Sequence, residues 1–580
     1  MPLERSAVPL TTRRPARALV ATALAAALAA AGVVPAMAAP TPEEPAGVVD
    51  PATDPATDPV VDPVAVSVIV PITTPPSATG LLSSDEIAAY TGPEGSLTRQ
   101  LDAVAGTPAV IALDPMILAS IRVLGSDAPE TAMQWVARLA ATSNEVFLLA
   151  YADADLVSAA RTDTLDAIVP SGFGFALDPA NFAGTAPATL LPEPSDEPTP
   201  DAPPPYPSTD DILDWETPLP RIAWPSTAVG RGDLAVIAGA GYDVVIVTSD
   251  AVGDPATPLV TIDGVTGMTG VVADAPLSSL LSDAVEGTTS MVRASALDAL
   301  EAALASDAAR TPGRHLVLTV ERDWPSATPG LAEALERLEA SEVVTSSTLA
   351  DVLTLPPTTA RLGDGAASAL RDEAFVSLAS DAAAELAFSS VLEDPSPLLD
   401  PRALERIALY SLGWERDESG WGAAVDAFHT RSDEIRSSVQ LEQSSDVALL
   451  ASAADLKVVV SNALPFPVTV QVTANPRNSL LRAELPPPLV IEPESTGTAR
   501  VPVEAIANGE VLVLTSLTSP TGIALDSGHA RVTVRAEWEG IGTLVVVIGL
   551  VLVFAAGIVR LIVVRRRARR DDRGAEGRDG

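Results

Sequence analysis

The sequence contains no cysteine, and this absence excludes several kinds of chemistry. A chain without thiols has no thiol catalysis, iron–sulfur cluster or cysteine-based zinc site, and it folds without disulfides. Its three histidines, His315, His429 and His529, lie in three separate regions. The motifs HExxH, GxSxG, GxxxxGK[ST] and His-x-x-x-His are also missing. We therefore expect no cofactor, no metal, and no hydrolytic activity that depends on a metal or a histidine.

Basic residues are few relative to acidic ones. The chain has 36 Lys and Arg residues and 76 Asp and Glu residues, which gives a formal net charge of -40. So acidic a chain repels nucleic acid and anionic lipid headgroups, and we expect no nucleic-acid partner. The charge also favours solubility, so it identifies no partner by itself. With 580 residues, the chain is too long for one ordinary domain.

A long apolar stretch near the end of the chain predicts one transmembrane helix over residues 541–564. Its first nineteen residues carry no charge, which is enough to cross a hydrocarbon core of ~30 Å. Arg560 is close enough to the end to reach the interface. Five arginines between Arg565 and Arg570 follow. This basic tail, residues 565–580, is predicted to be cytoplasmic, which places the preceding ectodomain outside the plasma membrane. A buried core helix is the alternative, but the arginine block disfavours it.

The first 38 residues have the pattern of a secretory signal peptide. A basic start is followed by an apolar run over residues 18–34 and by the cleavage pattern Ala36-Met37-Ala38. The alternative is an uncleaved anchor. Residues 39–65 then repeat Asp-Pro-Ala-Thr, and their prolines and like charges predict a disordered tether.

Residues 66–356 alternate short apolar runs with helical patterns. Strands are predicted at residues 66–70, 109–113, 146–150, 244–247 and 316–320, with helices between them. β-Branched, nearly continuous apolar strands favour a mostly parallel sheet covered on both faces. We therefore predict an α/β domain that resembles a β/α barrel, either closed or incomplete. A Pro-rich disordered insert near residues 187–212 interrupts it.

Acidic residues follow these predicted strands, and they have two interpretations. At the carboxyl ends of barrel strands, paired carboxylates could act as acid and base on a glycoside. Asp after a strand is also a common turn former or helix cap. The pair Glu321 and Asp323 is the best placed, because two residues apart on an extended segment project to one side, with Arg322 turned the other way. The candidate residues are Asp114, Asp153, Asp155, Asp250, Glu321 and Asp323.

Two further regions precede the transmembrane segment. Residues 357–445 are predicted to be helical, with Asp400 capping a helix that begins at Pro401. Trp414, Trp421 and Phe428 are more typical of a core than of a ligand site. In residues 446–537 the apolar period changes to two, and about six short strands with turn signals predict an immunoglobulin-like β-sandwich.

Short motifs along the chain resemble an uncharacterised family of actinobacterial cell-envelope membrane proteins. They are ALDP at 112–115, LLAYADAD at 148–155, WP at 224–225, VVVSN at 458–462 and VTVR at 532–535. The resemblance implies a β/α region similar to glycoside hydrolases and polysaccharide deacetylases. It also implies a role in wall assembly, because genes of such proteins are often found near that of a lipid II flippase. It transfers no catalytic residue.

Three functions are compatible with this organisation. The first is a non-catalytic envelope protein whose ectodomain binds or scaffolds cell-wall assembly proteins or wall glycan. The second is a carbohydrate-active hydrolase that uses strand-end carboxylates. The third is a surface adhesin or receptor. The sequence identifies neither the ligand nor the oligomeric state.

Overall fold

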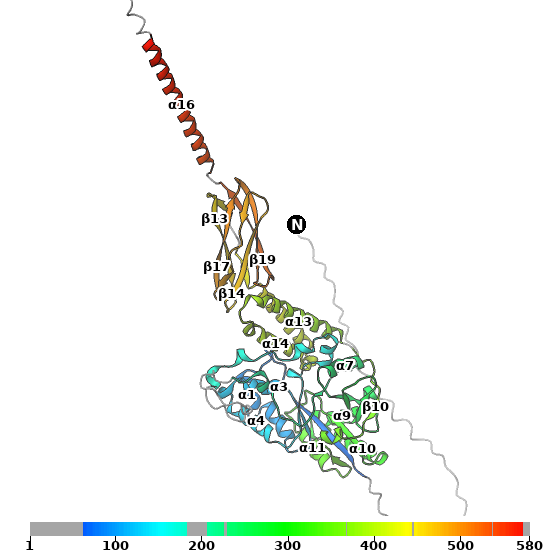
Figure 1. Ribbon diagram of the computed structural model, residues 1–580. Coiled ribbons are helices and arrows are strands. Elements are labelled where there is room, and N and C mark those ends of the chain that lie inside the picture. Colours follow the sequence, from blue (N-terminus) through cyan, green and yellow to red (C-terminus); the bar gives the residue numbers. More distant parts are fainter. Residues whose placement is uncertain are drawn as a thin grey trace, which may run out of the picture. The chain divides into compact units, whose positions relative to one another are not determined.

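The computed structural model describes residues 62–182, 206–225, 229–366, 368–442, 446–535 and 538–571 (Figure 1). The predicted signal peptide, most of the tether, residues 187–205 of the insert and the last nine residues of the tail lie outside this description. The end of the predicted insert forms a short helix, α6 (Thr209–Leu213), because Ser208 and Asp211 form a capping box at its start.

A ten-stranded sheet organises residues 64–360. All its strand pairs are parallel except β6 with β7, and the order is β10-β6-β7-β8-β1-β2-β3, with β4, β5 and β9 branching from this path. The strands are β1 (Val64–Ile72), β2 (Val110–Leu113), β3 (Val146–Leu148), β4 (Ile222–Ala223), β5 (Val244–Thr248), β6 (Leu259–Ile262), β7 (Thr269–Ala273), β8 (His315–Thr319), β9 (Val344–Ser346) and β10 (Thr358–Ala360).

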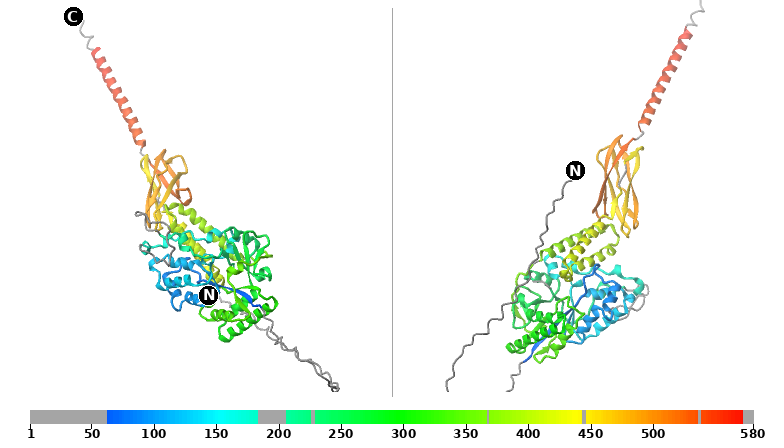
Figure 2. Two further views of the ribbon diagram at one scale, coloured as in Figure 1. Left: turned by 60° about the horizontal axis from the view of Figure 1, so that its bottom comes forward. Right: turned by 180° about the vertical axis from the view of Figure 1, so that it is seen from behind.

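The sheet curls into an open half-barrel, so the predicted α/β architecture is confirmed and the barrel is incomplete. Helices of this region surround it (Figure 2). They are α1 (Ser84–Thr91), α2 (Ser96–Val104), α3 (Pro115–Arg122), α4 (Glu130–Ala141), α5 (Leu156–Arg161), α7 (Arg231–Gly239), α8 (Ser249–Val252), α9 (Ala275–Glu286), α10 (Ser290–Arg310), α11 (Gly330–Glu339) and α12 (Leu349–Leu353).

Both faces of the sheet are buried. On β1, Val66, Val68 and Val70 belong to the larger apolar cluster, whereas Ile69 belongs to a smaller one. This division follows from the alternation of side chains along a strand. The smaller cluster includes residues of α12, so the inner face of the half-barrel is filled by side chains. The apolar runs in the sequence are therefore explained by packing.

Three helices follow: α13 (Ala369–Phe388), α14 (Ser396–Leu409) and α15 (Glu418–Arg436). Asp400 does not cap α14, contrary to the prediction. The helix begins at Ser396, five residues before Pro401, because Pro397 occupies its first turn and Pro401 is tolerated inside it. The Asp400 carboxylate instead accepts a hydrogen bond from the Ser171 hydroxyl at 2.7 Å.

Buried ionic contacts hold the three helices together. Arg402 of α14 donates to Glu385 of α13 at 2.8 Å, and it also pairs with Glu405. The Arg402 guanidinium lies 3.6 Å from the ring centre of Phe428 on α15. Trp421 and Phe428 are buried, as predicted for core residues, whereas Trp414 is only half-buried.

Two mostly antiparallel sheets follow, and their inward side chains form one apolar core. Phe388 and Val391, at the end of α13, belong to the same core. Three-residue strands lie at the edges of both sheets. The first sheet is β11 (Val439–Leu441), β13 (Ala453–Asn462), β17 (Ser495–Ala505) and β15 (Leu481–Ala483), and the second is β12 (Val447–Leu449), β19 (Ala524–Val534), β18 (Gly509–Thr518), β14 (Val468–Pro476) and β16 (Leu489–Ile491).

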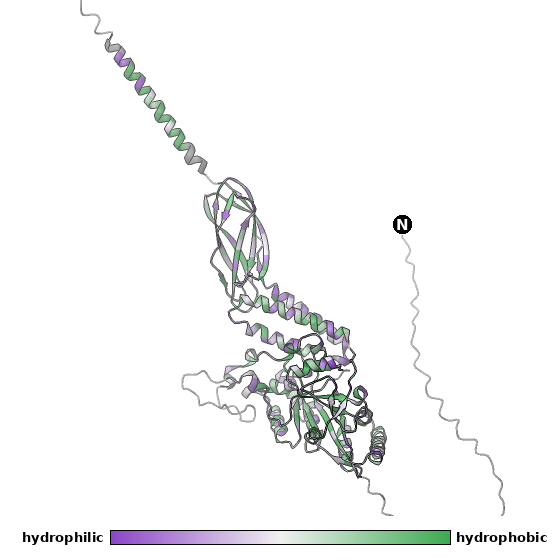
Figure 3. Cartoon of the chain, turned by 45° about the vertical axis from the view of Figure 1, so that its right-hand side comes forward, coloured by the Kyte–Doolittle hydropathy of each residue, from purple (hydrophilic) through white to green (hydrophobic). Residues whose placement is uncertain are grey.

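Two described helices are long and apolar enough to cross a membrane. One lies within α16 (Trp538–Asp571), at Leu544–Arg567, and none of it is buried. Figure 3 shows the apolar colouring along most of α16. The other is Ala369–Val391, which includes α13 and is one-third buried. Length and composition alone therefore associate the chain with a membrane but do not determine its topology.

Candidate functional site

A polar cavity of about 60 Å³ lies at the carboxyl ends of β1, β3 and β8. Thr73 and Thr74 follow β1, and a turn after β3 supplies Asp153. Residues of the 3₁₀ helix η7 (Leu412–Arg416), which follows α14, line it from the other side. We call it the strand-end cavity. Its charged lining is Asp153, Glu321, Asp323, Glu415, Arg322 and Arg416.

Asp153 and Arg322 form the buried ion pair of this cavity. The Arg322 Nε donates to Asp153 Oδ2 at 2.5 Å, and both side chains are largely buried. Arg322 also donates to the Trp224 carbonyl oxygen at 2.6 Å, and its guanidinium lies 4.7 Å from the centre of the Trp224 ring. Burial raises the pKa of Asp153, whereas Arg322 opposes the increase.

A strained turn places Asp153 in the cavity. Ala152 and Asp153 have φ angles of 56° and 48°, a left-handed conformation that residues other than glycine rarely adopt. Asp114 lies beside this turn, because the backbone N–H groups of Ala152 and Asp153 act to lower the pKa of its carboxyl group. The same carboxylate accepts from Met116 N at 2.9 Å and so caps α3. Asp114 therefore supports the site without lining it.

Burial, together with a smaller contribution from the negative charge of Asp153, raises the pKa of Asp114 from 3.8 to about 8. The three backbone donors oppose this shift, because they stabilise the carboxylate. Desolvation is the largest contribution, so Asp114 holds its proton over most of the neutral range.

Asp155 and Asp250 have other roles. The Asp155 carboxylate accepts from the N–H groups of Val157 and Ser158 and so caps α5. It also pairs with Arg371 of α13 at 3.2 Å, which links α13 to α5. Asp250 is exposed in the first turn of α8 and does not line the strand-end cavity. The helix-cap interpretation of strand-end acids therefore describes Asp114 and Asp155.

Glu321 and Asp323 both line the strand-end cavity, where the sequence places the best candidate pair. Arg322 lines it as well, contrary to the expected opposite orientation. The segment turns at Arg322 and Asp323 and is not extended, so the alternation of a strand does not apply. Asp323 pairs with Arg416 at 3.2 Å. Within the described parts of the chain, Glu321 has neither an ion pair nor a hydrogen bond.

Sequence reasoning missed several residues of the cavity. Arg416 and Glu415 come from the loop after α14, and no motif marks them. The Thr74 Oγ1 is buried and lacks a hydrogen-bond partner among the described residues. In the sequence Trp224 is only part of a short motif, whereas in the structure its ring packs against the Arg322 guanidinium. The strand-end acids could be found from sequence, but not the side chains that pair with them.

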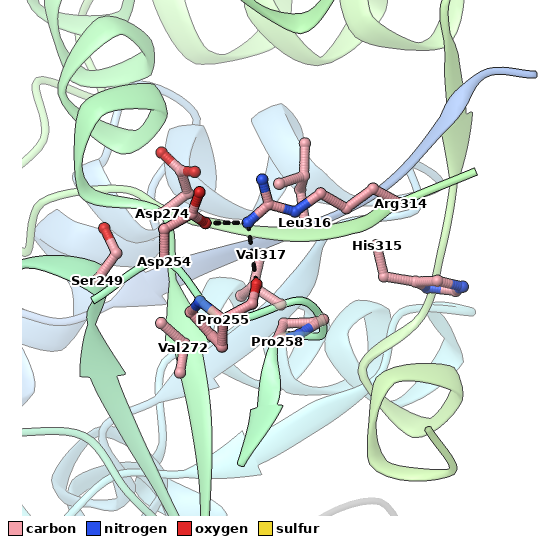
Figure 4. Close-up of a pocket in the computed structure, with 10 residues that line it drawn as sticks. All are labelled: Ser249, Asp254, Pro255, Pro258, Val272, Asp274, Arg314, His315, Leu316 and Val317. Carbon is pink, nitrogen blue, oxygen red and sulfur yellow. Dashed lines mark hydrogen bonds and ion pairs between the residues drawn. The ribbon is translucent and has the colours of Figure 1, made fainter. Parts of the chain in front are cut away.

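A metal site and a second cavity are the other candidates. Among the residues that the structure describes, no group of three or more His, Asp or Glu side chains could hold a metal ion. A second cavity, beside Arg314, Asp254 and Asp274, has a volume of only about 10 Å³ (Figure 4). That is room for one water molecule at most. Arg314 there pairs with Asp254 and Asp307, so this cluster holds loops together.

Comparisons with known proteins place residues 51–572 in a single family model, "Family of unknown function (DUF6049)". No curated protein matches the chain. Among solved structures, the chain is similar to WR4, an MSP family member of C. elegans, with 10% identity over 17% of this chain and 98% of that chain, at a TM-score of 0.13.

Two other solved structures have comparable similarity. The PapD-like domain of human CEP192 is 6% identical over 17% of this chain and 85% of its own, with a TM-score of 0.14. The E. coli chaperone DraB is 16% identical over 17% of this chain and 55% of its own, also with a TM-score of 0.14. Scores this low support no statement about fold or function.

Proposed function

The chain belongs to the family of unknown function DUF6049, and from its site we propose a non-catalytic envelope protein whose ectodomain binds or scaffolds cell-wall assembly components. The pairing of the strand-end acids carries this proposal. Asp114 and Asp155 cap helices, Asp153 pairs with Arg322, and Asp323 pairs with Arg416. Carboxylates that are paired in this way hold loops and helices in place. Glu321 lacks such a partner among the described residues, so its carboxylate is the one available to contact a ligand.

The membrane anchor is the next part of the proposal. We assign the membrane span to α16 alone, because none of its apolar segment is buried. In α13, by contrast, Arg371 and Glu385 are buried in ion pairs with Asp155 and Arg402. Charges paired to neighbouring elements are typical of a protein core. A cleaved signal peptide, an immunoglobulin-like module before α16 and an external ectodomain complete the proposal.

Site-directed photocrosslinking in intact cells tests the binding role. A photoreactive amino acid replaces Glu321 in the strand-end cavity, and the matched control carries it at exposed Glu336 on α11. We expect crosslinks to wall-assembly proteins or wall glycan from position 321 and not from position 336. Identical crosslinked products from the two positions would contradict a binding role for the cavity.

The convergence of Asp153, Glu321 and Asp323 on one cavity favours a second candidate, a carbohydrate-active hydrolase. A purified enzyme of this kind would release reducing ends from wall glycan. It would also lose that activity in Glu321→Gln or Asp323→Asn, which keep the side-chain shape. We expect no release by the wild-type chain. If the wild-type chain releases reducing ends and either variant does not, the enzymatic proposal is correct and the binding proposal is wrong.

A further inference from the structure

Three polar side chains meet between α13 and α15, which lie side by side. Ser377 and Asp381 are four residues apart and therefore share one face of α13. His429 of α15 lies between them and contacts both. We call this group the interhelical relay. None of its members lines the strand-end cavity.

The two imidazole nitrogens have different partners. Nδ1 lies 2.5 Å from Asp381 Oδ2, and Nε2 lies 3.4 Å from Ser377 Oγ. A carboxylate only accepts hydrogen bonds when it is ionised, so it holds the proton of a neutral imidazole on Nδ1. The lone pair of Nε2 then faces the serine hydroxyl. This order, hydroxyl to imidazole to carboxylate, is the one in which a histidine acts as a base toward a serine.

The interhelical relay is partly exposed to solvent, and Arg436 lies beside its carboxylate. The side chains of His429 and Asp381 are 34% and 18% exposed, so neither is sealed in the core. Arg436 of α15 lies 3.9 Å from the other Asp381 oxygen. The Ser377 hydroxyl also donates to the Ala374 carbonyl oxygen at 2.9 Å, and rotation about its Cβ–Oγ bond turns the proton from that oxygen toward Nε2.

The sequence predicts no histidine-dependent hydrolysis, and we propose a different reaction, in which Ser377 is a nucleophilic serine that takes an acyl group from activated esters and keeps it. His429 is its base, and Asp381 orients His429. Ser377 Oγ forms a bond to the ester carbonyl carbon, and its proton passes to Nε2. The bond from that carbon to the leaving oxygen then breaks, and Nε2 returns the proton to the departing alcohol. The product is an acyl-serine at position 377.

The helix restricts what this serine can do. In an α-helix, backbone N–H groups bond to carbonyl oxygens four residues back, so those of Ser377 and Leu378 are occupied within α13. They therefore cannot form an oxyanion hole. In enzymes that have one, removing a single donor lowers the catalytic rate by a factor on the order of 10²–10³. The site therefore suits esters with good leaving groups, and the acyl-serine persists instead of turning over rapidly.

Labelling of the purified full chain in detergent with a fluorescent fluorophosphonate tests this inference. Such a probe phosphonylates activated serines and expels fluoride. We expect one adduct, located on Ser377 by mass spectrometry and absent from Ser377→Ala. Loss of a general base slows such a step by about 10²–10⁴-fold, so His429→Gln should reduce the labelling rate by at least 100-fold.

Two more variants separate chemistry from folding. Asp381→Asn keeps the shape of the side chain but no longer fixes the proton on Nδ1, and it should also slow labelling. Ser380→Ala, one turn along α13 and exposed, should label like the wild type. The inference fails if Ser377 is not labelled. It also fails if His429→Gln, with an unchanged unfolding temperature, is labelled at the wild-type rate.

Discussion

Asp114 is a carboxyl group that the folded chain keeps protonated near neutral pH. Its pKa is about 8 in the folded protein and 3.8 as the ordinary value. Between these values the folded state binds a proton that the unfolded state has released. The stability from this group is therefore complete below about pH 4 and is lost as the pH rises through 8.

We expect Asp114→Asn to remove this pH dependence. Asparagine resembles the protonated acid, and its amide oxygen can still accept from Met116 N. The unfolding temperature of the wild-type chain should fall between pH 5 and pH 8, and that of the variant should fall less. Asp417→Asn, at the exposed cap of α15, controls for exchanging a cap carboxylate. Equal slopes for wild type and Asp114→Asn would contradict the role of Asp114.

At the residue level, strand ends could be located from sequence, but side-chain roles could not. A run of β-branched residues followed by Asp predicts both a catalytic carboxylate and a helix cap. Asp153 and Asp155 are two residues apart, yet one lines the strand-end cavity and the other caps α5. The difference depends on Arg322 and Arg371, which lie far away in sequence. Local patterns carry no information about such distant partners.

Among the elements, Gly80 fixes how closely α14 approaches the β/α region. Its φ angle is 75°, and a Cβ at this position would lie 2.2 Å from the Leu404 carbonyl oxygen of α14. Gly80→Ala therefore forces backbone atoms apart, in addition to the ~1–2 kcal/mol of a left-handed alanine.

Gly106→Ala is the matched control, because its φ is 80° and a Cβ there meets nothing within 4 Å. Thermal or denaturant unfolding should show a clearly larger loss for Gly80→Ala than for Gly106→Ala. Similar losses of stability in the two variants would mean that only the backbone strain of alanine at positive φ destabilises them. The close approach of α14 would then contribute nothing to stability.

The Arg402 network makes a second prediction for the helices. Arg402→Met leaves Glu385, with a side chain 2% exposed, buried without its cation. Removing one partner of a buried pair costs about 3–5 kcal/mol of unfolding free energy. Arg337→Met breaks the half-exposed pairs with Asp298 and Glu301 and should cost less than about 1 kcal/mol. Denaturant unfolding of both variants checks the contrast, and equal losses would refute it.

The length of an element determined how well it could be predicted. Strands β2, β5 and β8 lie where apolar runs predict them, since each is a run of four or five mostly apolar and β-branched residues. β11, β12 and β15 were missed, because a strand of three residues is too short to display a period. The start of α14 was misplaced because two prolines compete for the first turn, and the first of them occupies it.

For the whole molecule, the proposed topology predicts which parts a protease can reach. If α16 is the span and its arginines stay inside, external protease on wall-stripped cells should digest the ectodomain and spare a tag after Gly580. Immunoblotting for the tag and for an ectodomain epitope measures both. A cleaved tag with a protected ectodomain would reverse the proposed orientation.

Helix α13 connects two apolar cores and can transmit force between them. Helix α13 contributes Phe375 and Leu378 to the core of the β/α region and Phe388 to the core of the antiparallel sheets. It is ~30 Å long at ~1.5 Å per residue, and it packs into the first core through side chains of its first half and into the second core at its C-terminal end. If α16 anchors the chain as proposed, a force pulling on the chain would pass between the two cores through α13 and its neighbour α14, which also contributes Leu404 and Leu398 to them. The same force would act on the interhelical relay, because α13 carries Ser377 and the adjacent α15 carries His429.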